Sequence, residues 1–379
     1  MVHYRARETA TQGAIINSRL LLLLALSLAG GIAAADAIRQ TKNDHYDAFR
    51  QLDEVLPTPN VYRTASGAPG SQYWQQRADY KIDVALDEAQ RRITGSATIT
   101  YTNRSPDTLR YIWLQLDQNR FAKGSAARLS EAAANPGSIA DKEERDILTY
   151  RKLAQSQSYA DNVHGHEIES VTDARGRDLP YTIVDTMMRI DLPTPLRPGQ
   201  RSAISVAWAF NIIDHTAIGG RNGYDRFEDS DTYIFFLAQW FPRLVAYTDY
   251  AGWQHQQFLG RGEFTLEFGD YDVAITVPED HIVSSTGELQ NAGDVLTSEQ
   301  RRRLRQARNA ESPMYIVTPE EALANEKDKA SGMRTWRFTA ENVRDFAWAS
   351  SRKFIWDAMV HKQQGARYPE VLAMSFYPN

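Results

Sequence analysis

The chain has 379 residues, of which 42% are hydrophobic and 24% are charged, a composition typical of globular proteins. Its formal net charge is −5, which excludes a global basic field of the kind that attracts nucleic acid, so we expect no nucleic-acid partner. The sequence contains no cysteine, which excludes disulfides, thiolate zinc sites, a cysteine nucleophile and a lipid anchor on cysteine.

Residues 1–37 are predicted to be a secretory signal peptide. Three arginines within the first 19 residues precede an apolar run, 20–28, and small residues follow up to Ala37. A positive flank, a short apolar stretch and an A-x-A-like end are the three parts of such a signal. The alternative is an uncleaved anchor, although the apolar stretch is shorter than the roughly 20 residues of a spanning helix. We therefore expect an exported protein, periplasmic or secreted, which contacts a membrane only if the signal stays uncleaved.

Residues 38–78 are predicted to form a short helix and an extended linker. Apolar side chains recur at helical spacing within 40–56, at Tyr46, Phe49, Leu52 and Leu56. The segment that follows, 57–73, is rich in Pro, Gly and Ser, which favour turns and extended chain.

Alternating apolar and polar residues dominate residues 79–356 and predict an antiparallel β domain. Tyr80, Ile82 and Val84, for example, alternate with polar neighbours, so one face of the strand is buried and the other is wet. At least nine short segments with turns between them favour a mainly β fold, either a sandwich or open antiparallel sheets. The turn residues at 173–178 predict a hairpin between the strands on either side.

Two segments interrupt this pattern and predict short helical insertions. Residues 122–163 are polar and rich in alanine, and we expect one or two surface helices there. Residues 297–328 contain two capping boxes, Thr297 with Gln300 and Thr318 with Glu321, each of which marks a helix start. The basic run RRRLR within this excursion is interpreted as a solvated helix face rather than a nucleic-acid patch.

A search for catalytic motifs finds none. The zinc motif H-E-x-x-H begins only at His166 and Glu167, and Ser170 stands where the second histidine is needed. The G-x-S-x-G and nucleotide-binding glycine motifs do not occur either. We therefore predict no catalytic residue and no metal ligand within this chain.

Isolated polar residues are weaker candidates for a site. His164 and His166 have the spacing of a two-ligand pair on a strand, but a strand edge beside a solvated loop is the preferred interpretation. His215 and His255 have no visible third ligand, and satisfied polar or surface roles suit them better. The acidic loop with Glu228, Asp229 and Asp231 could form a calcium site or a carbohydrase pair, and solvated charge is the simpler interpretation.

Several segments between residues 79 and 355 occur in a characteristic order. They are DYKIDVALDEAQRRITGSATITYTNRSPDTLRYIWLQLD, PLRPGQRSAISVAWAFNI, AQWFPRL, AITVPEDHIVSSTGEL and VRDFAWASSRKF. Together they resemble the N-terminal β domain of the aminopeptidase N family of zinc peptidases, the gluzincins. The resemblance implies a saddle-like β domain that caps an active site located in a following zinc-binding domain.

The same resemblance implies a function and its limits. The chain would be the N-terminal, substrate-capping part of an exported zinc aminopeptidase, whose peptide substrates and zinc are held by the catalytic domain. The G-x-M-E-N and H-E-x-x-H motifs of that domain do not occur in these 379 residues, so we expect the chain to be inactive alone. Residues 357–379 are expected to be a stub of that domain, either in a natural truncation or in a fragment, with Leu372, Met374 and Phe376 lacking the partners they would have in a complete enzyme.

One residue carries a binding role by this resemblance. Family members have a Gln or Glu near the free amino group of the substrate, and Gln239, three residues before Pro242, is the matching candidate. The alternative is a strand residue with a structural hydrogen bond. Phe346 and Trp348 are expected to face the core of the β domain. The alternative function is an independent exported β-sandwich module that binds a protein or a glycan.

Overall fold

The computed structural model describes residues 59–131, 163–260, 265–327, 329–365 and 370–379, together with the single residues 150, 153, 157 and 262. The predicted signal peptide and the predicted helix at 40–56 lie outside these residues, as does most of the predicted insertion at 122–163. The chain divides into a smaller unit, 1–74 with 249–252, and a larger unit with the rest. In the described part of the chain, no helix is long and apolar enough to cross a membrane.

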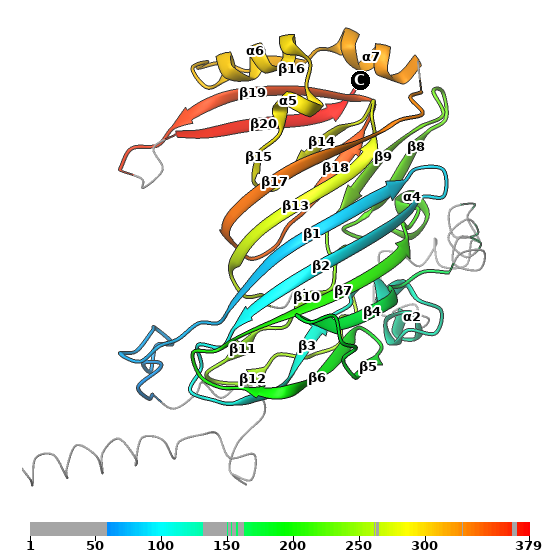
Figure 1. Cartoon of the computed structure of the whole chain (residues 1–379). Coiled ribbons are helices and arrows are strands. Elements are labelled where there is room, and N and C mark those ends of the chain that lie inside the picture. The colour runs from blue at the N-terminus through cyan, green and yellow to red at the C-terminus, as the bar shows by residue number, and fades with distance from the viewer. Residues whose placement is uncertain are drawn as a thin grey trace, which may run out of the picture. The chain divides into compact units, whose positions relative to one another are not determined.

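The described residues are mainly β, as predicted from the alternating pattern (Figure 1). The strands are β1 (Arg77–Asp87), β2 (Arg92–Thr102), β3 (Leu109–Gln115), β4 (Glu167–Asp173), β5 (Tyr181–Val184), β6 (Met187–Leu196), β7 (Arg201–Asn211), β8 (Gly223–Phe227), β9 (Thr232–Leu237), β10 (Arg243–Leu244), β11 (Tyr247–Thr248), β12 (Gly252–Trp253), β13 (Gly269–Pro278), β14 (Ile282–Ser285), β15 (Glu288–Leu289), β16 (Met314–Val317), β17 (Met333–Val343), β18 (Trp348–Ser351), β19 (Phe354–Lys362) and β20 (Glu370–Pro378). The helices are η1 (Asp117–Phe121), α2 (Ala126–Glu131), α4 (His215–Ile218), α5 (Ala292–Val295), α6 (Ser298–Ala307) and α7 (Pro319–Lys327).

A seven-stranded sheet forms the middle of the larger unit, in the order β15-β17-β13-β1-β2-β7-β4 (Figure 1). Along β1 the side chains of Tyr80, Ile82 and Val84 are buried, while Lys81 and Asp83 are exposed, which confirms the predicted one-sided burial. The pair β1 and β13 is parallel, in contrast to the antiparallel pairing expected throughout. A parallel pair requires a long crossover, and here the chain between the two strands passes through other sheets.

The turn predicted at 173–178 is confirmed, but the predicted pairing of the two strands that flank it is wrong. Two backbone bonds close the turn, Asp173 N to Arg177 O and Leu179 N to Val171 O. Beyond it, β4 pairs with β7 in the seven-stranded sheet, whereas β5 pairs with β6 in a four-stranded sheet of order β10-β3-β6-β5. The reason is a tighter turn between Val184 and Met187, which face each other across β5 and β6. Such short turns determine which strand a neighbour pairs with.

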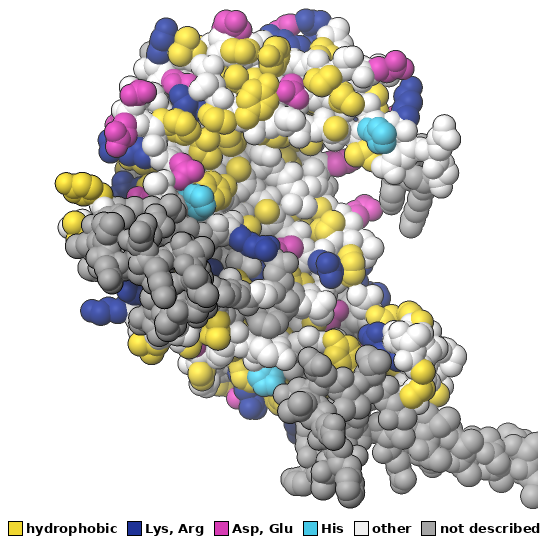
Figure 2. Space-filling model, turned by 180° about the vertical axis from the view of Figure 1, so that it is seen from behind, with side chains coloured by type: hydrophobic (Ala, Val, Ile, Leu, Met, Phe, Trp, Pro, Cys, Tyr) yellow, Lys and Arg dark blue, Asp and Glu magenta, His cyan; other side chains and the backbone are white. Residues whose placement is uncertain are grey.

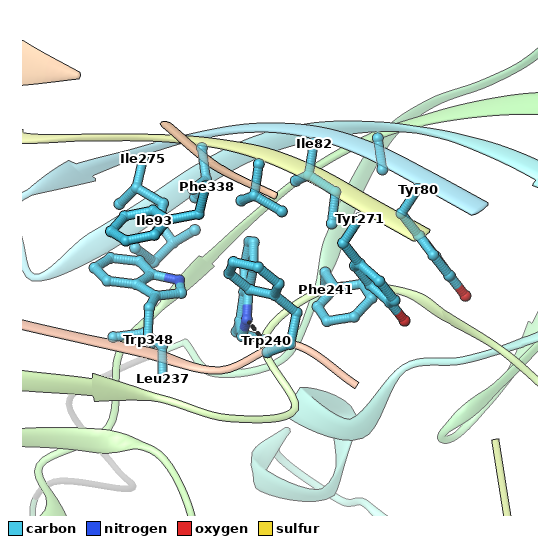
Figure 3. Packing of buried hydrophobic residues seen from close by; sticks show 14 of the residues in the cluster. Tyr80, Ile82, Ile93, Leu237, Trp240, Phe241, Tyr271, Ile275, Phe338 and Trp348 are labelled. Carbon is cyan, nitrogen blue, oxygen red and sulfur yellow. Dashed lines mark hydrogen bonds between the residues drawn. The ribbon is translucent and has the colours of Figure 1, made fainter. Parts of the chain in front are cut away.

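The core of the larger unit lies between the seven-stranded sheet and the segments around β9 and β18. In Figure 3 Leu237, Trp240 and Trp348 face side chains of the sheet, among them Ile82, Ile275 and Phe338. The Trp240 indole donates a hydrogen bond to the carbonyl oxygen of Phe346 over 2.8 Å. Phe346 and Trp348 are both buried, as predicted. Since each buried aromatic side chain removes roughly 150–250 Å² from water, this cluster is a main source of stability.

The predicted helical excursion at 297–328 contains α6 and α7. Both capping boxes are confirmed, because Thr297 and Gln300 exchange hydrogen bonds at the start of α6, and Thr318 and Glu321 do so at the start of α7. The sequence pattern missed the short strand β16 between the helices, which pairs with β19. The arginine run lies on α6, where Arg303 binds Glu321.

The C-terminal strands β19 and β20 pair along their whole length. The boundary predicted between residues 356 and 357 therefore falls within β19. Phe376 has partners within this chain, since its ring stacks on Trp356 with centroids 5.0 Å apart. Leu372 packs against the core, while Met374 is exposed. Among the described strands, β20 pairs with β19, and most of its residues are exposed.

The smaller unit contains one ordered cluster in its described residues. The Arg63 guanidinium lies 5.2 Å from the ring centres of both Tyr73 and Tyr250, and its Nε binds Asp249 at 2.8 Å. A stacked and ion-paired arginine of this kind stabilises short loops. The predicted extended linker therefore contains a structured turn.

Candidate functional site: a polar pocket around Gln239

Gln239 occupies a strained turn directly after β9. Its φ angle is +57°, a left-handed backbone conformation that residues other than glycine rarely adopt. Trp240 and Phe241, the next two residues, are fully buried in the core, and this burial holds the turn in place. The backbone oxygen of Gln239 accepts a 2.7 Å hydrogen bond from Nε2 of Gln118. The structural hydrogen bond considered as an alternative role is therefore made by the backbone, and the side chain is left for other contacts.

The side chain of Gln239 lines a pocket of about 220 Å³ in the larger unit. The pocket brings together residues from five separate segments of the chain. They are Gln115, Arg221, Ala238, Gln239, Arg243, Phe258, Leu266, Arg344 and Asp345. Arg243 and Gln115 are opposite each other in the pairing of β10 with β3, which explains why they share one wall.

A buried ion-pair network forms the base of this wall. Arg243 is only 7% exposed and binds both oxygens of Asp117 at 2.9 Å, through Nε and Nη2. Its third nitrogen, Nη1, binds Asp345 at 2.7 Å. Burial favours the neutral guanidine, but the attraction of the two carboxylates outweighs burial and raises the pKa of Arg243. Arg243 is therefore charged at any physiological pH.

Buried amides surround this ion-pair network. Gln115 donates from Nε2 to Asp117 at 2.9 Å, which leaves its carbonyl oxygen for other partners. Gln118, which holds the backbone of Gln239, is itself oriented by Asn222 at 3.0 Å. Each of these bonds fixes an amide that would otherwise rotate. The pocket is therefore organised before any ligand enters.

The Gln239 amide is the exception in this ordered surrounding. The residue is 8% exposed, yet among the described residues its side chain makes no hydrogen bond. Neither of its amide atoms is among the fully buried side-chain atoms without a partner, so the amide is open to water within the pocket. An unpaired amide that lines a pocket offers both a donor and an acceptor to an incoming group.

His164 and His166, which have the spacing of a two-ligand pair, do not form a metal site with other described residues. Both ring nitrogens of His166 are buried without partners, and burial lowers the pKa of its imidazole to about 3. The ring packs edge-on against Phe210 with centroids 5.5 Å apart. Within the described ranges, no three His, Asp or Glu side chains come together as metal ligands. Zinc therefore does not fit the residues that the structure describes.

The remaining polar candidates have structural partners. His215 lies 3.4 Å from Asp225, and the ring of His255 stacks on Trp113. In the acidic loop, Asp231 binds Arg226 at 2.8 Å. These contacts agree with the expectation that the two histidines have structural or surface roles and that the acidic loop is solvated charge.

One arrangement that the sequence did not reveal looks like a nucleophile with its base. Ser350 Oγ lies 2.9 Å from Nδ1 of His281, whose Nε2 lies 3.5 Å from Glu88. Ser350 is completely buried, so no substrate can reach it. Burial raises the pKa of Glu88, but His281 and Arg352 outweigh burial and lower it to about 2. The arrangement is a buried structural network rather than a catalytic one.

The pocket residues other than Gln239 carried no recognisable signal in the sequence. Gln115 ends an apolar strand, and Asp345 directly precedes the buried Phe346, so each is a polar residue in an apolar context. This polar residue in an apolar context is the only local sign that Gln115 or Asp345 could line a site. Figure 2 shows that basic and acidic side chains are interspersed on the face of the molecule drawn there.

No family model matches the sequence, and no curated protein is significantly similar to it. The structural matches include solved structures of M1 zinc metallopeptidases. A mutant from Deinococcus radiodurans bound to a Tyr-Ser-Ala substrate matches with a TM-score of 0.41 and 12% identity, over 80% of this chain and 48% of that one. Another structure of the enzyme from that organism matches with a TM-score of 0.40 and 11% identity, over 80% and 47%. The chain thus spans about half the length of these proteins.

Proposed function

We propose that this chain is the N-terminal, substrate-capping β part of an exported zinc aminopeptidase. In this proposal the pocket around Gln239 receives the free amino end of a peptide. The ordered sequence segments between residues 79 and 355 support the family, and the unpaired Gln239 amide in a preorganised pocket supports the binding role. The Gln239 amide is the observation that carries the proposal.

The pocket supplies acceptors that suit an ammonium group. These are the amide oxygens of Gln239 and Gln115 and the carboxylate of Asp345, whose side chain is 39% exposed. An ammonium has three donors and no acceptor, so it requires several oxygens at once. A volume of about 220 Å³ is below the range of drug-sized pockets and suits about one amino-acid residue.

The chain's own residues would bind and orient the peptide rather than cleave it. The motifs H-E-x-x-H and G-x-M-E-N do not occur in the 379 residues. In a complete enzyme of this kind, zinc would activate the water that attacks the first peptide bond. This chain would hold the amino end of the peptide in a fixed position. That position would determine which peptide bond is cleaved.

Calorimetric titration of the 379-residue chain with dipeptides tests the binding role. Gln-Ala is expected to bind, and N-acetyl-Gln-Ala is not, because acetylation removes the ammonium. Gln239→Ala should weaken the binding of Gln-Ala about tenfold, the effect of losing a hydrogen bond to a charged group. Equal binding of the acetylated and free dipeptides would contradict the proposal, and so would no binding of either.

A second test concerns chemistry. The purified chain is expected to retain no stoichiometric zinc after dialysis and to cleave no aminoacyl-coumarin substrate. Hydrolysis that a chelator abolishes and zinc restores would show that the chain carries a catalytic centre of its own, contrary to the proposal.

A further inference from the structure

The short helix η1 places one amide side chain directly behind the Gln239 turn. Gln118 is almost completely buried, and its Nε2 donates a 2.7 Å hydrogen bond to the backbone oxygen of Gln239. The residue before it, Asp117, accepts two hydrogen bonds from Arg243, and this ion pair fixes η1 against β10. Gln118 therefore holds the backbone of Gln239 from a helix that is itself anchored.

Asn222 determines which way round the amide of Gln118 lies. A glutamine amide has an acceptor oxygen at one end and donor hydrogens at the other. Nδ2 of Asn222 donates to Oε1 of Gln118 over 3.0 Å, so the oxygen of this amide faces Asn222 and its NH2 group faces Gln239. Asn222 is as deeply buried as Gln118. The two hydrogen bonds, from Asn222 to Gln118 and from Gln118 to Gln239, form an amide relay with one fixed direction.

The loop that carries Asn222 approaches η1 closely because it is rich in glycine. Its sequence is GGRNG, residues 219–223, and it connects α4 with β8. A Cβ added at Gly220 would lie 3.1 Å from the ring of Phe121, the last residue of η1, which is closer than an ordinary van der Waals contact. A side chain at this position would push the loop away from η1. The glycine therefore allows Asn222 to reach Gln118.

The backbone of Gln239 needs a restraint of this kind. Its φ angle of +57° is strained for a residue with a side chain. The burial of Trp240 fixes the chain after the turn, and the hydrogen bond from Gln118 holds the carbonyl that joins Gln239 to Trp240. This bond opposes the backbone rotation that would relieve the strain. Because the side chain of Gln239 leaves from the same backbone, such a rotation would move its amide within the pocket.

We propose that Gln118 and Asn222 are positioning residues for the amide of Gln239. They fix the backbone of Gln239 so that its side chain meets the amino end of a peptide. Neither of them is among the residues that line the pocket, so they act through Gln239 and do not touch the peptide. This proposal rests on the proposed function and extends it to two residues behind the pocket wall.

Calorimetric titration of the 379-residue chain and its variants with Gln-Ala tests the relay. Gln118→Met keeps the length of the side chain but removes the donor, and it should weaken binding about tenfold. Asn222→Asp has nearly the native shape but only acceptors, so it should turn the Gln118 amide round. Asn222→Ala removes a donor without reversing the amide, so it should weaken binding less than Asn222→Asp does.

The order of the two Asn222 variants distinguishes the relay from a packing role. If Asn222 only fills space, the alanine variant should bind worse than the aspartate variant, because alanine leaves a cavity. That order would overturn the proposal. The matched control is Asn309→Asp at an exposed position after α6, which should leave binding unchanged. Circular dichroism shows which variants are folded, and if the buried carboxylate of Asn222→Asp prevents folding, Gln118→Met provides the test.

Titration of the Gln239→Ala background separates positioning from general damage to the pocket. Gln118→Met should have no further effect on binding once the Gln239 amide is gone, because it acts through that amide. An equal loss in both backgrounds, or no loss in the native one, would overturn the positioning role. If Gln239→Ala itself weakens binding, the proposed function still stands in these two cases. If the native chain binds no Gln-Ala, both proposals fail.

Discussion

Arg243 and Asp117 form a buried two-point ion pair, in which Nε and Nη2 of the guanidinium each lie 2.9 Å from one carboxylate oxygen. The two residues are far apart in the sequence, and their contact joins β10 to η1 at the base of the Gln239 pocket. Both side chains are almost inaccessible to water. The pocket therefore depends on a charge pair whose members cannot be removed one at a time without cost.

Replacing Arg243 by Met should lower the free energy of unfolding by about 3–5 kcal/mol, because buried Asp117 loses the charged partner that offsets its burial. Urea unfolding followed by tryptophan fluorescence measures this loss. The double variant with Asp117→Asn should be less destabilised than Arg243→Met alone. The control is the exposed pair of Arg302 with Glu299, whose loss should change the free energy of unfolding by less than about 1 kcal/mol. A loss at Arg243 as small as in this control would contradict the interpretation.

Gln239→Gly and Gln239→Ala should differ in stability but not in binding. Glycine adopts the left-handed backbone at φ +57° without strain, so Gln239→Gly should be as stable as the native chain or more so. Gln239→Ala keeps the strain, and its free energy of unfolding should be about 1 kcal/mol below that of the glycine variant. Both variants lack the amide, so dipeptide binding should weaken equally in both. Full binding by the glycine variant would show that the amide has no role.

Glu267 should make the protein less stable as the pH rises. Burial raises the pKa of its carboxyl from 4.5 to about 7, and the hydrogen bond from the backbone of Tyr247 opposes this only in part. The folded state therefore binds the proton more tightly than the unfolded state, so stability falls between pH 4.5 and pH 7 and stays low above pH 7. A rise of this size in the pKa of Glu267 corresponds to up to about 3 kcal/mol.

Glu267→Gln tests this dependence, because the amide oxygen can still accept the hydrogen bond but cannot ionise. The variant should be more stable than the native chain at pH 8 and nearly equal to it at pH 4.5. Urea unfolding at a series of pH values measures the difference. A stability difference that is the same at both pH values would rule out the ionisation of Glu267 as its cause.

Export should remove the first residues of the chain. When the full sequence is produced with its own leader in a bacterium, the mature protein is expected to begin close to Ala37, after the small residues at the end of the apolar stretch. N-terminal sequencing of the periplasmic fraction measures the cleavage site. Replacing Ala35 by a bulky residue such as Phe should block cleavage. An uncleaved protein in the membrane fraction of native cells would favour the anchor.

Local patterns in the sequence predicted the elements of this fold well. The alternation in β1 and the two capping boxes depend on residues a few positions apart, and the structure confirms them. The prediction that Phe346 and Trp348 lie in the core is also confirmed. It could be made because large aromatic side chains are usually buried. These features could be predicted because their cause lies within one element.

The choice of strand partners could not be predicted in the same way. The pattern in β4 and β5 shows that both are strands, but not that they belong to different sheets. Likewise nothing local distinguishes the parallel pair of β1 and β13 from an antiparallel one. Alternation determines which face of a strand is buried, and pairing depends on turns and on contacts with distant segments.

For the site, the sequence by itself determined that Gln239 is a candidate binding residue, through its place in a resemblance, and that the zinc motif does not occur in these residues. Only the tertiary structure decided which side chains surround Gln239, because Gln115 lies far in the sequence from Arg344 and Asp345. Only the fold also decided the charge of the pocket. The sequence gives the sign of each charged side chain. The effect of that charge on a ligand depends on how deeply the side chain is buried and on its partners. Burial and partners are set only when distant strands pair.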